Sequence, residues 1–255
     1  MTLLHGGPGA PGHMAPVARR LQDEFRVMEL FERRSGPVPL SVALHVHDVE
    51  AAVADVVGDE RCAVIGFSSG VVTALSFAAC NPGRVGAVVV IGSCTFSIAA
   101  REELKRRLTR RMDRAALERL GELERLTDPE VRIAEQARLV TPFYLVDPIG
   151  APEEVWLDGR GHMETWRDML RLQEEGLHPE EFQTIRAPVL MLHGSEDPHP
   201  GELIRDSLAA VIPQIEYVEL ERCGHYPWLE RPAHEEFFRI LATWLDDLPG
   251  RDASL

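Results

Sequence analysis

Short apolar segments of strand length alternate with amphipathic segments of helix length along most of this chain, and this alternation constrains the fold more than any other feature. The strand-like segments are residues 2–4, 26–30, 62–65, 87–91, 188–192 and 216–220. The helix-like segments between them are residues 14–24, 44–57, 71–80, 201–211 and 232–245. Such alternation predicts an α/β fold, with a mostly parallel sheet and helices on both faces.

The alternation stops in the middle of the chain, where no strand-like segment occurs for about eighty residues. The helical segments predicted there are residues 101–126, 129–139 and 161–175. Arginines and one lysine of the first segment are interleaved with acidic residues at helical spacing, which favours a solvated, salt-bridged face over an anion-binding one. An α-helical insertion is therefore expected to interrupt one α/β core.

The balance of charge excludes some classes of partner. The chain has 27 Lys and Arg residues but 41 Asp and Glu residues, which gives a formal net charge of -14. A surface of this kind repels nucleic acid and anionic membranes, so a small-molecule substrate is the expected partner. The sequence shows no leader or membrane-span pattern, and its 4 cysteines form no C-x-x-C pair. A protein of the reducing cytoplasm is expected.

The strand at 62–65 runs into Gly66-Phe67-Ser68-Ser69-Gly70 and then directly into an apolar helix. This is G-x-S-x-G in the strand, turn and helix context of a nucleophile elbow. A tight turn places the serine in a strained backbone conformation, and side chains at positions 66 or 70 would collide with neighbouring backbone. Ser68 is therefore predicted to stand exposed above the sheet, at the positive end of the following helix.

An acid and a histidine follow later strands in the order that such a serine requires. Asp197 comes after the strand at 188–192, and His225 comes after the strand at 216–220. Parallel α/β sheets gather their ligands at these strand ends. Glu196 is the alternative acid, and His234 is a less favourable histidine because it lies within a helical pattern.

The stretch HGGPGAPG at residues 5–12 allows two interpretations. Its glycines fit the G-x-G-x-x-G spacing of a dinucleotide-binding turn. That turn needs free backbone amides around a pyrophosphate, and Pro8 and Pro11 have none. The stretch is therefore interpreted as an oxyanion loop, and no nicotinamide cofactor is expected.

Together, HGGPG, GFSSG, HGSEDP and CGHYPWLERP resemble the α/β-hydrolase superfamily over nearly the whole chain. The HGGPG loop and the GHYPWLERP ending are most similar to the branch of proline iminopeptidases and carbon-carbon bond hydrolases. The resemblance implies an eight-stranded sheet with a helical cap, and it favours Asp197 as the acid. It implies an oxyanion hole formed by the N–H groups of Gly7 and Ser69. The expected parts are residues 1–94 and 186–255 for the α/β-hydrolase core and 95–185 for the helical cap insertion.

The sequence departs from this superfamily at its beginning. Members usually carry a β-hairpin before the oxyanion strand, whereas only four residues precede His5. Two antiparallel strands are therefore expected to be missing, which leaves the strand at 26–30 at the edge of the sheet. Because an uncovered apolar edge tends to pair with another chain, either a homodimer through this edge or an unstable protein is expected.

Aromatic residues are the candidates for a substrate pocket. They are Phe67, Phe143, Tyr144, Trp156 and Trp166. All but Phe67 lie in the insertion, where they could equally hold it together. Acidic residues of the insertion, such as Glu153, Glu154 and Glu164, could bind a substrate amine as in iminopeptidases, but no motif identifies them.

Other histidines are given structural roles. His5 is expected to support the oxyanion loop, His193 to end a buried strand, and His199 to be exposed. His45 and His47 are two residues apart on a predicted helix and point to different sides, so no metal site is predicted.

The sequence thus favours a cofactor-free serine hydrolase that cleaves a small carboxylic ester, lactone or thioester. Removal of an N-terminal proline is an alternative, although Ser69 stands where proline iminopeptidases typically have tryptophan after the nucleophile. Carbon-carbon bond hydrolysis is a second alternative, since the same three residues suffice for it. A third is a ligand-binding protein that keeps the hydrolase scaffold without catalysis.

Overall fold

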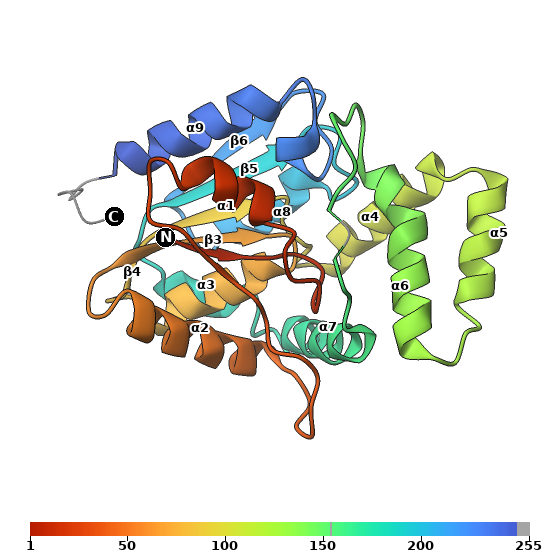
Figure 1. The fold of residues 1–255 in the computed structure, drawn as a ribbon, viewed down its shortest axis with the longest axis horizontal. Coiled ribbons are helices and arrows are strands. Elements are labelled where there is room, and N and C mark those ends of the chain that lie inside the picture. Colours follow the sequence, from red (N-terminus) through yellow and green to blue (C-terminus); the bar gives the residue numbers. More distant parts are fainter. Residues whose placement is uncertain (154, 249–255) are drawn as a thin grey trace.

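A six-stranded, all-parallel sheet forms the centre of the computed structural model, which describes residues 1–153 and 155–248 (Figure 1). The strands are β1 (Thr2–Leu4), β2 (Met28–Leu30), β3 (Cys62–Phe67), β4 (Val85–Ile91), β5 (Val189–Gly194) and β6 (Ile215–Leu220). Their order in the sheet is β2-β1-β3-β4-β5-β6, and every neighbouring pair is parallel. The α/β-hydrolase fold class is confirmed. The sheet has six strands in the described chain, whereas the family resemblance implies eight.

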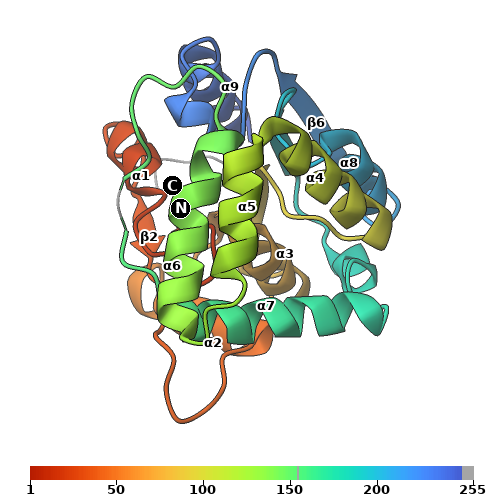
Figure 2. The same cartoon turned by 90° about the vertical axis from the view of Figure 1, so that its right-hand side faces the viewer.

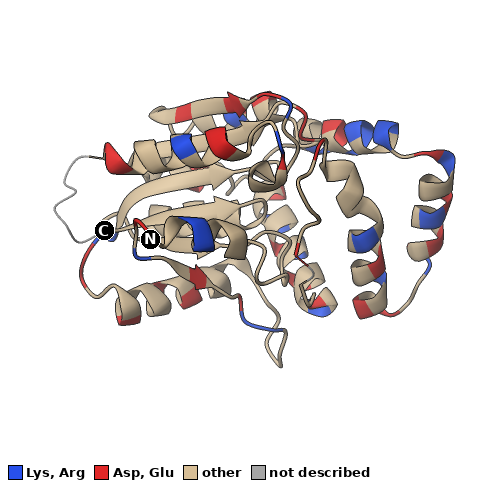
Figure 3. Ribbon diagram, turned by 45° about the horizontal axis from the view of Figure 1, so that its top comes forward, with Lys and Arg blue, Asp and Glu red and all other residues tan. Residues whose placement is uncertain are grey.

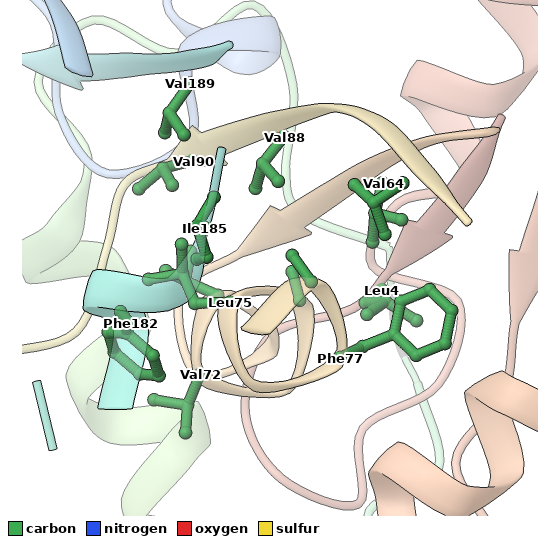
Figure 4. Packing of buried hydrophobic residues seen from close by; sticks show 14 of the residues in the cluster. Leu4, Val64, Val72, Leu75, Phe77, Val88, Val90, Phe182, Ile185 and Val189 are labelled. Atoms are coloured by element: carbon green, nitrogen blue, oxygen red, sulfur yellow. The ribbon is translucent and has the colours of Figure 1, made fainter. Parts of the chain in front are cut away.

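Helices cover both faces of the sheet. The helices are α1 (Ala15–Leu21) and α9 (His234–Asp246) on one face, and α2 (Val42–Val56), α3 (Gly70–Cys80) and α8 (Gly201–Ala209) on the other. Residues of a strand alternate between the faces. On β4, Val88 and Val90 belong to the cluster with α3, whereas Val89 and Ile91 belong to the cluster with α9. Figure 4 shows the first cluster filling the space between the strands and α3.

A helical insertion lies between β4 and β5, beyond the ends of the strands where Ser68 is found (Figures 1 and 2). It contains α4 (Ile98–Arg111), α5 (Arg114–Leu123), α6 (Pro129–Val140), the short 3-10 helix η1 (Thr141–Tyr144), α7 (Gly159–Glu174) and the 3-10 helix η2 (Glu180–Thr184). A third 3-10 helix in the described chain, η3 (Pro227–Leu229), follows His225.

The single helix predicted over residues 101–126 is wrong. The chain breaks it into α4 and α5 at Met112, whose ψ of 134° is extended rather than helical. Asp113 then begins α5, because its carboxylate accepts a hydrogen bond from the N–H of Ala116 at 2.8 Å. An Asp that caps a new helix start competes with continuation of the old one.

The charged face of α4 and α5 is a network of ion pairs, as the sequence pattern indicates. Glu103 pairs with Arg106 and Arg107, and Arg114 pairs with Glu118 one turn later. Figure 3 shows basic and acidic residues interspersed along the insertion helices. In the described part of the chain, no helix combines the length and the apolar character needed to cross a membrane.

Helix α7 fastens the insertion to the core through its acidic side chains. Asp158, which precedes α7, accepts hydrogen bonds from the backbone N–H and the hydroxyl of Ser35. Glu164 and Asp168 accept the N–H groups of Leu40 and Val42, each at 2.9 Å. These bonds satisfy backbone groups of the loop that leads into α2, so this end of the insertion has a fixed place on the core.

We expect the β2 edge to mediate self-association. The strand pairs with β1 on one side only, and Phe31 beside it is 60% exposed. Light scattering coupled to size exclusion should detect a dimer at micromolar concentration, and Phe31→Lys should convert it to a monomer because a charge blunts an open edge. Val56→Lys, at an exposed position on α2, is the control. A wild-type protein that is monomeric at all concentrations would contradict this expectation.

His178 makes stability depend on pH. Burial lowers its pKa from the usual 6.5 to about 4. Because the folded-state pKa is depressed, this residue favours folding above pH 6.5, and that contribution is lost as pH falls towards 4. The free energy of unfolding, measured in urea, should fall by about 2 kcal/mol less between pH 7 and pH 5 in His178→Gln than in the wild type. Equal losses in both proteins would show that His178 does not titrate in this range.

Candidate active site

Ser68 occupies the sharp turn between β3 and α3. Its φ of +52° is one of two positive values among the non-glycine residues of the described chain, and such a backbone is strained. The glycines on either side permit the turn: a Cβ on Gly66 would lie 2.7 Å from the Gly70 oxygen, and one on Gly70 would lie 2.5 Å from the His5 oxygen. Ser68 is half-buried at the N-terminal end of α3. The local geometry is that of a nucleophile elbow.

Asp197 and His225 meet where the loops after β5 and β6 come together. Oδ2 of Asp197 accepts a hydrogen bond from Nδ1 of His225 at 2.7 Å, and both side chains are buried. The two alternatives lie elsewhere, because Glu196 is exposed and the Nδ1 of His234 bonds to the Trp228 carbonyl. Of these four residues, the structure brings together the two that the sequence favours.

Burial and hydrogen bonding set the charges of this pair. Burial alone would raise the pKa of Asp197, but His225, His199 and His193 surround it and hold that pKa well below its usual value. Burial lowers the pKa of His225, although Asp197 opposes the shift. His225 is therefore a neutral base at neutral pH, with a proton on Nδ1 directed at the carboxylate.

His225 and Ser68 face the same cavity. The His225 ring packs against Phe67 with ring centroids 4.9 Å apart, and a Cβ on Gly92 would lie only 3.1 Å from its Nδ1. In the described chain Ser68 Oγ makes no hydrogen bond to His225. Hydrogen bonds of this kind are often long without substrate and tighten when it binds.

The loop at residues 5–9 brings further backbone to Ser68. A Cβ on Gly6 would lie 2.7 Å from the Cβ of Ser68 and from the Phe67 ring, so only glycine fits. Gly7 has a φ of +57° and lines the cavity beside Ser69. Neither the N–H of Gly7 nor that of Ser69 donates to a group in the described residues. Two unpartnered donors beside the serine are what an oxyanion requires.

His5 supports this loop through hydrogen bonds beneath it, as predicted. Its ring is buried, and Nε2 accepts a hydrogen bond from the N–H of Glu32 at 3.1 Å. The Glu32 carboxylate in turn accepts the N–H of Gly9 at 3.1 Å. The insertion reaches the loop as well, because the N–H of Asp158 donates to the Gly9 carbonyl at 2.9 Å. The candidate oxyanion loop is thus fixed from both sides.

A cavity of about 980 Å³ opens above Ser68, between the core and the insertion. Four of the five predicted pocket residues line it, namely Phe67, Tyr144, Trp156 and Trp166. Phe143 does not, and this prediction is corrected. Phe143 and Tyr144 are consecutive residues of the 3-10 helix η1, where neighbouring side chains point about 120° apart, so only Tyr144 faces His225.

Among the described residues, the carboxylates that line the cavity are all engaged. Glu130 accepts the N–H groups of Gly159 and Arg160, Glu135 pairs with Arg138, and Glu153 pairs with Arg19. Glu164 binds backbone on the core side and does not line the cavity. Glu154 lies outside the described residues.

His199 is the residue of this site that the sequence reasoning missed. It is 7% exposed rather than exposed as expected, and its ring stacks on His225 with centroids 4.5 Å apart. The only signal in the sequence is its place two residues after Asp197, in the same loop. His193 ends the buried strand β5, as predicted.

Asp197, His199 and His225 are also the residues best placed to hold a metal ion in the described chain. They offer ligand atoms within 4.8 Å of one another. The Nδ1 atoms of both histidines already donate hydrogen bonds to the Asp197 carboxylate, and a bound ion would have to replace these bonds. His45 and His47 do not form a site, because His45 is buried and His47 is exposed.

Comparisons with known proteins identify the family and the fold. A statistical model of the alpha/beta hydrolase family matches residues 3–236. No curated protein sequence matches the chain at a significant level. Similar structures include a thermophilic esterase from Thermogutta terrifontis, which is 23% identical with a TM-score of 0.63 over 97% of this chain and 89% of that one.

Two further similar structures have other stated activities. The enol-lactonase from Burkholderia xenovorans LB400 is 19% identical, with a TM-score of 0.64 over 96% of this chain and 90% of its own. A proline iminopeptidase from Mycobacterium smegmatis is 21% identical, with a TM-score of 0.64 over 96% of this chain and 88% of its own. Identities this low establish a shared fold and leave the substrate open.

The fit at Gly6 provides a test of the geometry. Gly6→Ala places a methyl group 2.7 Å from Ser68 and Phe67, and we expect it to destabilise the protein by about 1–3 kcal/mol. Gly36→Ala, where a Cβ meets nothing within 4 Å, is the matched control and should change stability by less than about 0.5 kcal/mol. Urea unfolding measures both. Equal effects would mean that the loop does not approach Ser68 as closely as described.

Proposed function

The chain belongs to the alpha/beta hydrolase family, and we propose that it is a serine hydrolase that cleaves a carboxylic ester, lactone or thioester. The observation that carries the proposal is the arrangement around Ser68. A strained serine, a histidine that is bonded to a buried aspartate, and two backbone donors without a partner among the described residues lie at one cavity. The proposed catalytic residues are Ser68, His225 and Asp197. No cofactor is required for this chemistry.

In the proposed mechanism Ser68 Oγ attacks the carbonyl carbon of the substrate while Nε2 of His225 takes its proton. Asp197 keeps the other proton of the ring on Nδ1 and stabilises the imidazolium that forms. His225 then gives its proton to the leaving oxygen or sulfur, and an acyl-enzyme remains. Water attacks the acyl group with His225 again as the base, which releases the acid and restores Ser68.

The N–H groups of Gly7 and Ser69 are proposed to bind the oxyanion. Each tetrahedral intermediate carries a negative oxygen, and two fixed amides in a site shielded from water stabilise it strongly. The fixed position of the loop supports this role, since His5, Glu32 and Asp158 hold it before substrate arrives. Removing one such donor typically costs about a hundredfold or more in rate.

The cavity favours an acyl substrate over an N-terminal amine. A substrate ammonium needs an available carboxylate, and the three cavity carboxylates that the structure describes are engaged with arginines or backbone amides. Apolar side chains of α6, among them Val131, Ile133 and Val140, line the same space. The volume of about 980 Å³ suits a substrate with an apolar acyl or alcohol group.

Labelling with a fluorophosphonate tests the proposal without knowledge of the substrate. The probe phosphonylates an activated serine, so the wild type should react and Ser68→Ala should not. Asp197→Asn should slow labelling about a thousandfold or more, because the amide disfavours the required tautomer of His225. Glu196→Gln, one residue away and exposed, should label at the wild-type rate.

The outcomes separate the alternatives. A folded wild type that stays unlabelled would overturn the catalytic proposal and favour a ligand-binding protein. Labelling that persists in Ser68→Ala would place the nucleophile elsewhere. If Ser68 is labelled, turnover of esters, lactones and thioesters is expected to exceed that of proline arylamides and vinylogous diketones. A preference for either of the last two would change the substrate class to aminopeptidase or carbon-carbon bond hydrolase.

A further inference from the structure

A second imidazole shares the carboxylate of Asp197. Oδ2 of Asp197 accepts from His225 at 2.7 Å, and Oδ1 accepts from Nδ1 of His199 at 3.0 Å. Oδ1 also accepts the backbone N–H of His199 at 2.8 Å. The proposed mechanism uses only Oδ2 and gives no role to Oδ1 or to His199.

The network fixes the tautomer of His199. Asp197 is fully buried and ionised, so the ring nitrogens that approach it must donate. His199 therefore carries its proton on Nδ1, as His225 does. The two rings lie nearly parallel, 20° apart, with centroids 4.5 Å from one another, so each senses the charge of the other.

His199 is itself held in place from several sides. Its carbonyl accepts a hydrogen bond from Nε2 of His193 at 2.9 Å. Tyr144 packs against both imidazole rings, with centroids 5.5 Å from that of His199 and 5.1 Å from that of His225. Such support keeps Nδ1 on Oδ1 without substrate, which is the condition for a lasting influence on Asp197.

We propose that His199 is a positioning residue for the histidine and aspartate pair, and that by occupying Oδ1 it makes His225 a weaker base than the same pair would be alone. The proposal rests on the proposed serine hydrolase function. A carboxylate that already accepts two hydrogen bonds on Oδ1 gives less of its charge to the imidazolium on Oδ2. The neighbouring imidazole adds to this effect, because His199 lowers the pKa of His225.

Several other titratable or charged side chains face the His225 and Asp197 pair. Those that face it from the surrounding elements are His193, Tyr144, Tyr226, His13 and Arg107, whose guanidinium lies 3.5 Å from the Asp197 carbonyl oxygen. Both tyrosines have raised pKa values and stay neutral, and the pKa of His13 is lowered to about 4. Burial also lowers the pKa values of His193 and His225, so both imidazoles are neutral at neutral pH.

The rate of fluorophosphonate labelling of Ser68 as a function of pH tests the proposal, because the reaction needs His225 unprotonated. His199→Phe keeps a ring in the stack and removes the donor to Oδ1. Its acid midpoint should rise by at least about half a pH unit, since His225 becomes more basic. His199→Asn keeps a donor near the position of Nδ1, and its midpoint should return towards the wild type. His47→Phe, at an exposed histidine of α2, is the control for the substitution itself.

The result that would overturn the proposal is a midpoint in His199→Phe at or below that of the wild type, or an equal rise in His199→Asn. Thermal unfolding establishes that each variant is folded. If His199→Phe does not fold, proton NMR of the wild type and of His199→Asn tests the proposal instead. The wild type should show two downfield ring N–H signals, and His199→Asn should show one of them. A single signal in the wild type would overturn the proposal. Failure of the proposed function would appear differently, as absence of labelling in the wild type.

Discussion

The buried carboxylate of Asp197 is the interaction on which the candidate site depends. A fully buried negative charge is costly unless donors surround it, and here imidazole and backbone N–H groups from two loops converge on its two oxygens. The loops after β5 and β6 must therefore meet. They do so closely enough that a Cβ on Gly194 would lie 2.2 Å from the Gly224 oxygen. The charge that the proposed chemistry uses is thus also what holds the two loops together.

Close backbone approach is the second constraint, and it links the start of the chain to Ser68. The end of β1 lies against the elbow, so that Gly6, Gly66 and Gly70 leave no room for a Cβ. This contact places the amide of Gly7 beside that of Ser69. The same loop is bound by the insertion through Asp158. The serine, the candidate oxyanion donors and the walls of the cavity therefore belong to one connected set of contacts.

The insertion does two different things. Its last helix, α7, is fixed to the core by carboxylates that bind backbone amides before α2. Its first part carries charged pairs on its surface and apolar residues towards the cavity, as on α6. Substrate selection is expected to depend on this first part, since Ser68 and its partners lie wholly on the core. This division agrees with similar folds that carry different stated activities on the same sheet.

The sequence by itself determined the fold class and the order of the functional segments. Apolar periodicity fixed the strands to within a few residues, and G-x-S-x-G after a strand identified Ser68, because both signals depend on neighbours along the chain. Asp197 and His225 followed from their places after strands of a parallel sheet. The break at Met112 was missed because a single helix cap competes poorly with a continuous charged pattern when only the sequence is considered.

Only the tertiary structure decided which side chains contact one another and which of them face the cavity. Nothing in the local pattern distinguishes Phe143 from Tyr144, yet one faces the cavity and the other does not. Similarly, His199 reads as an ordinary loop histidine, and its second bond to Asp197 arises because residues distant in sequence, such as Tyr144 and His225, pack around it. Burial and charge at a site are sums over neighbours in space, and a sequence pattern contains only the neighbours along the chain.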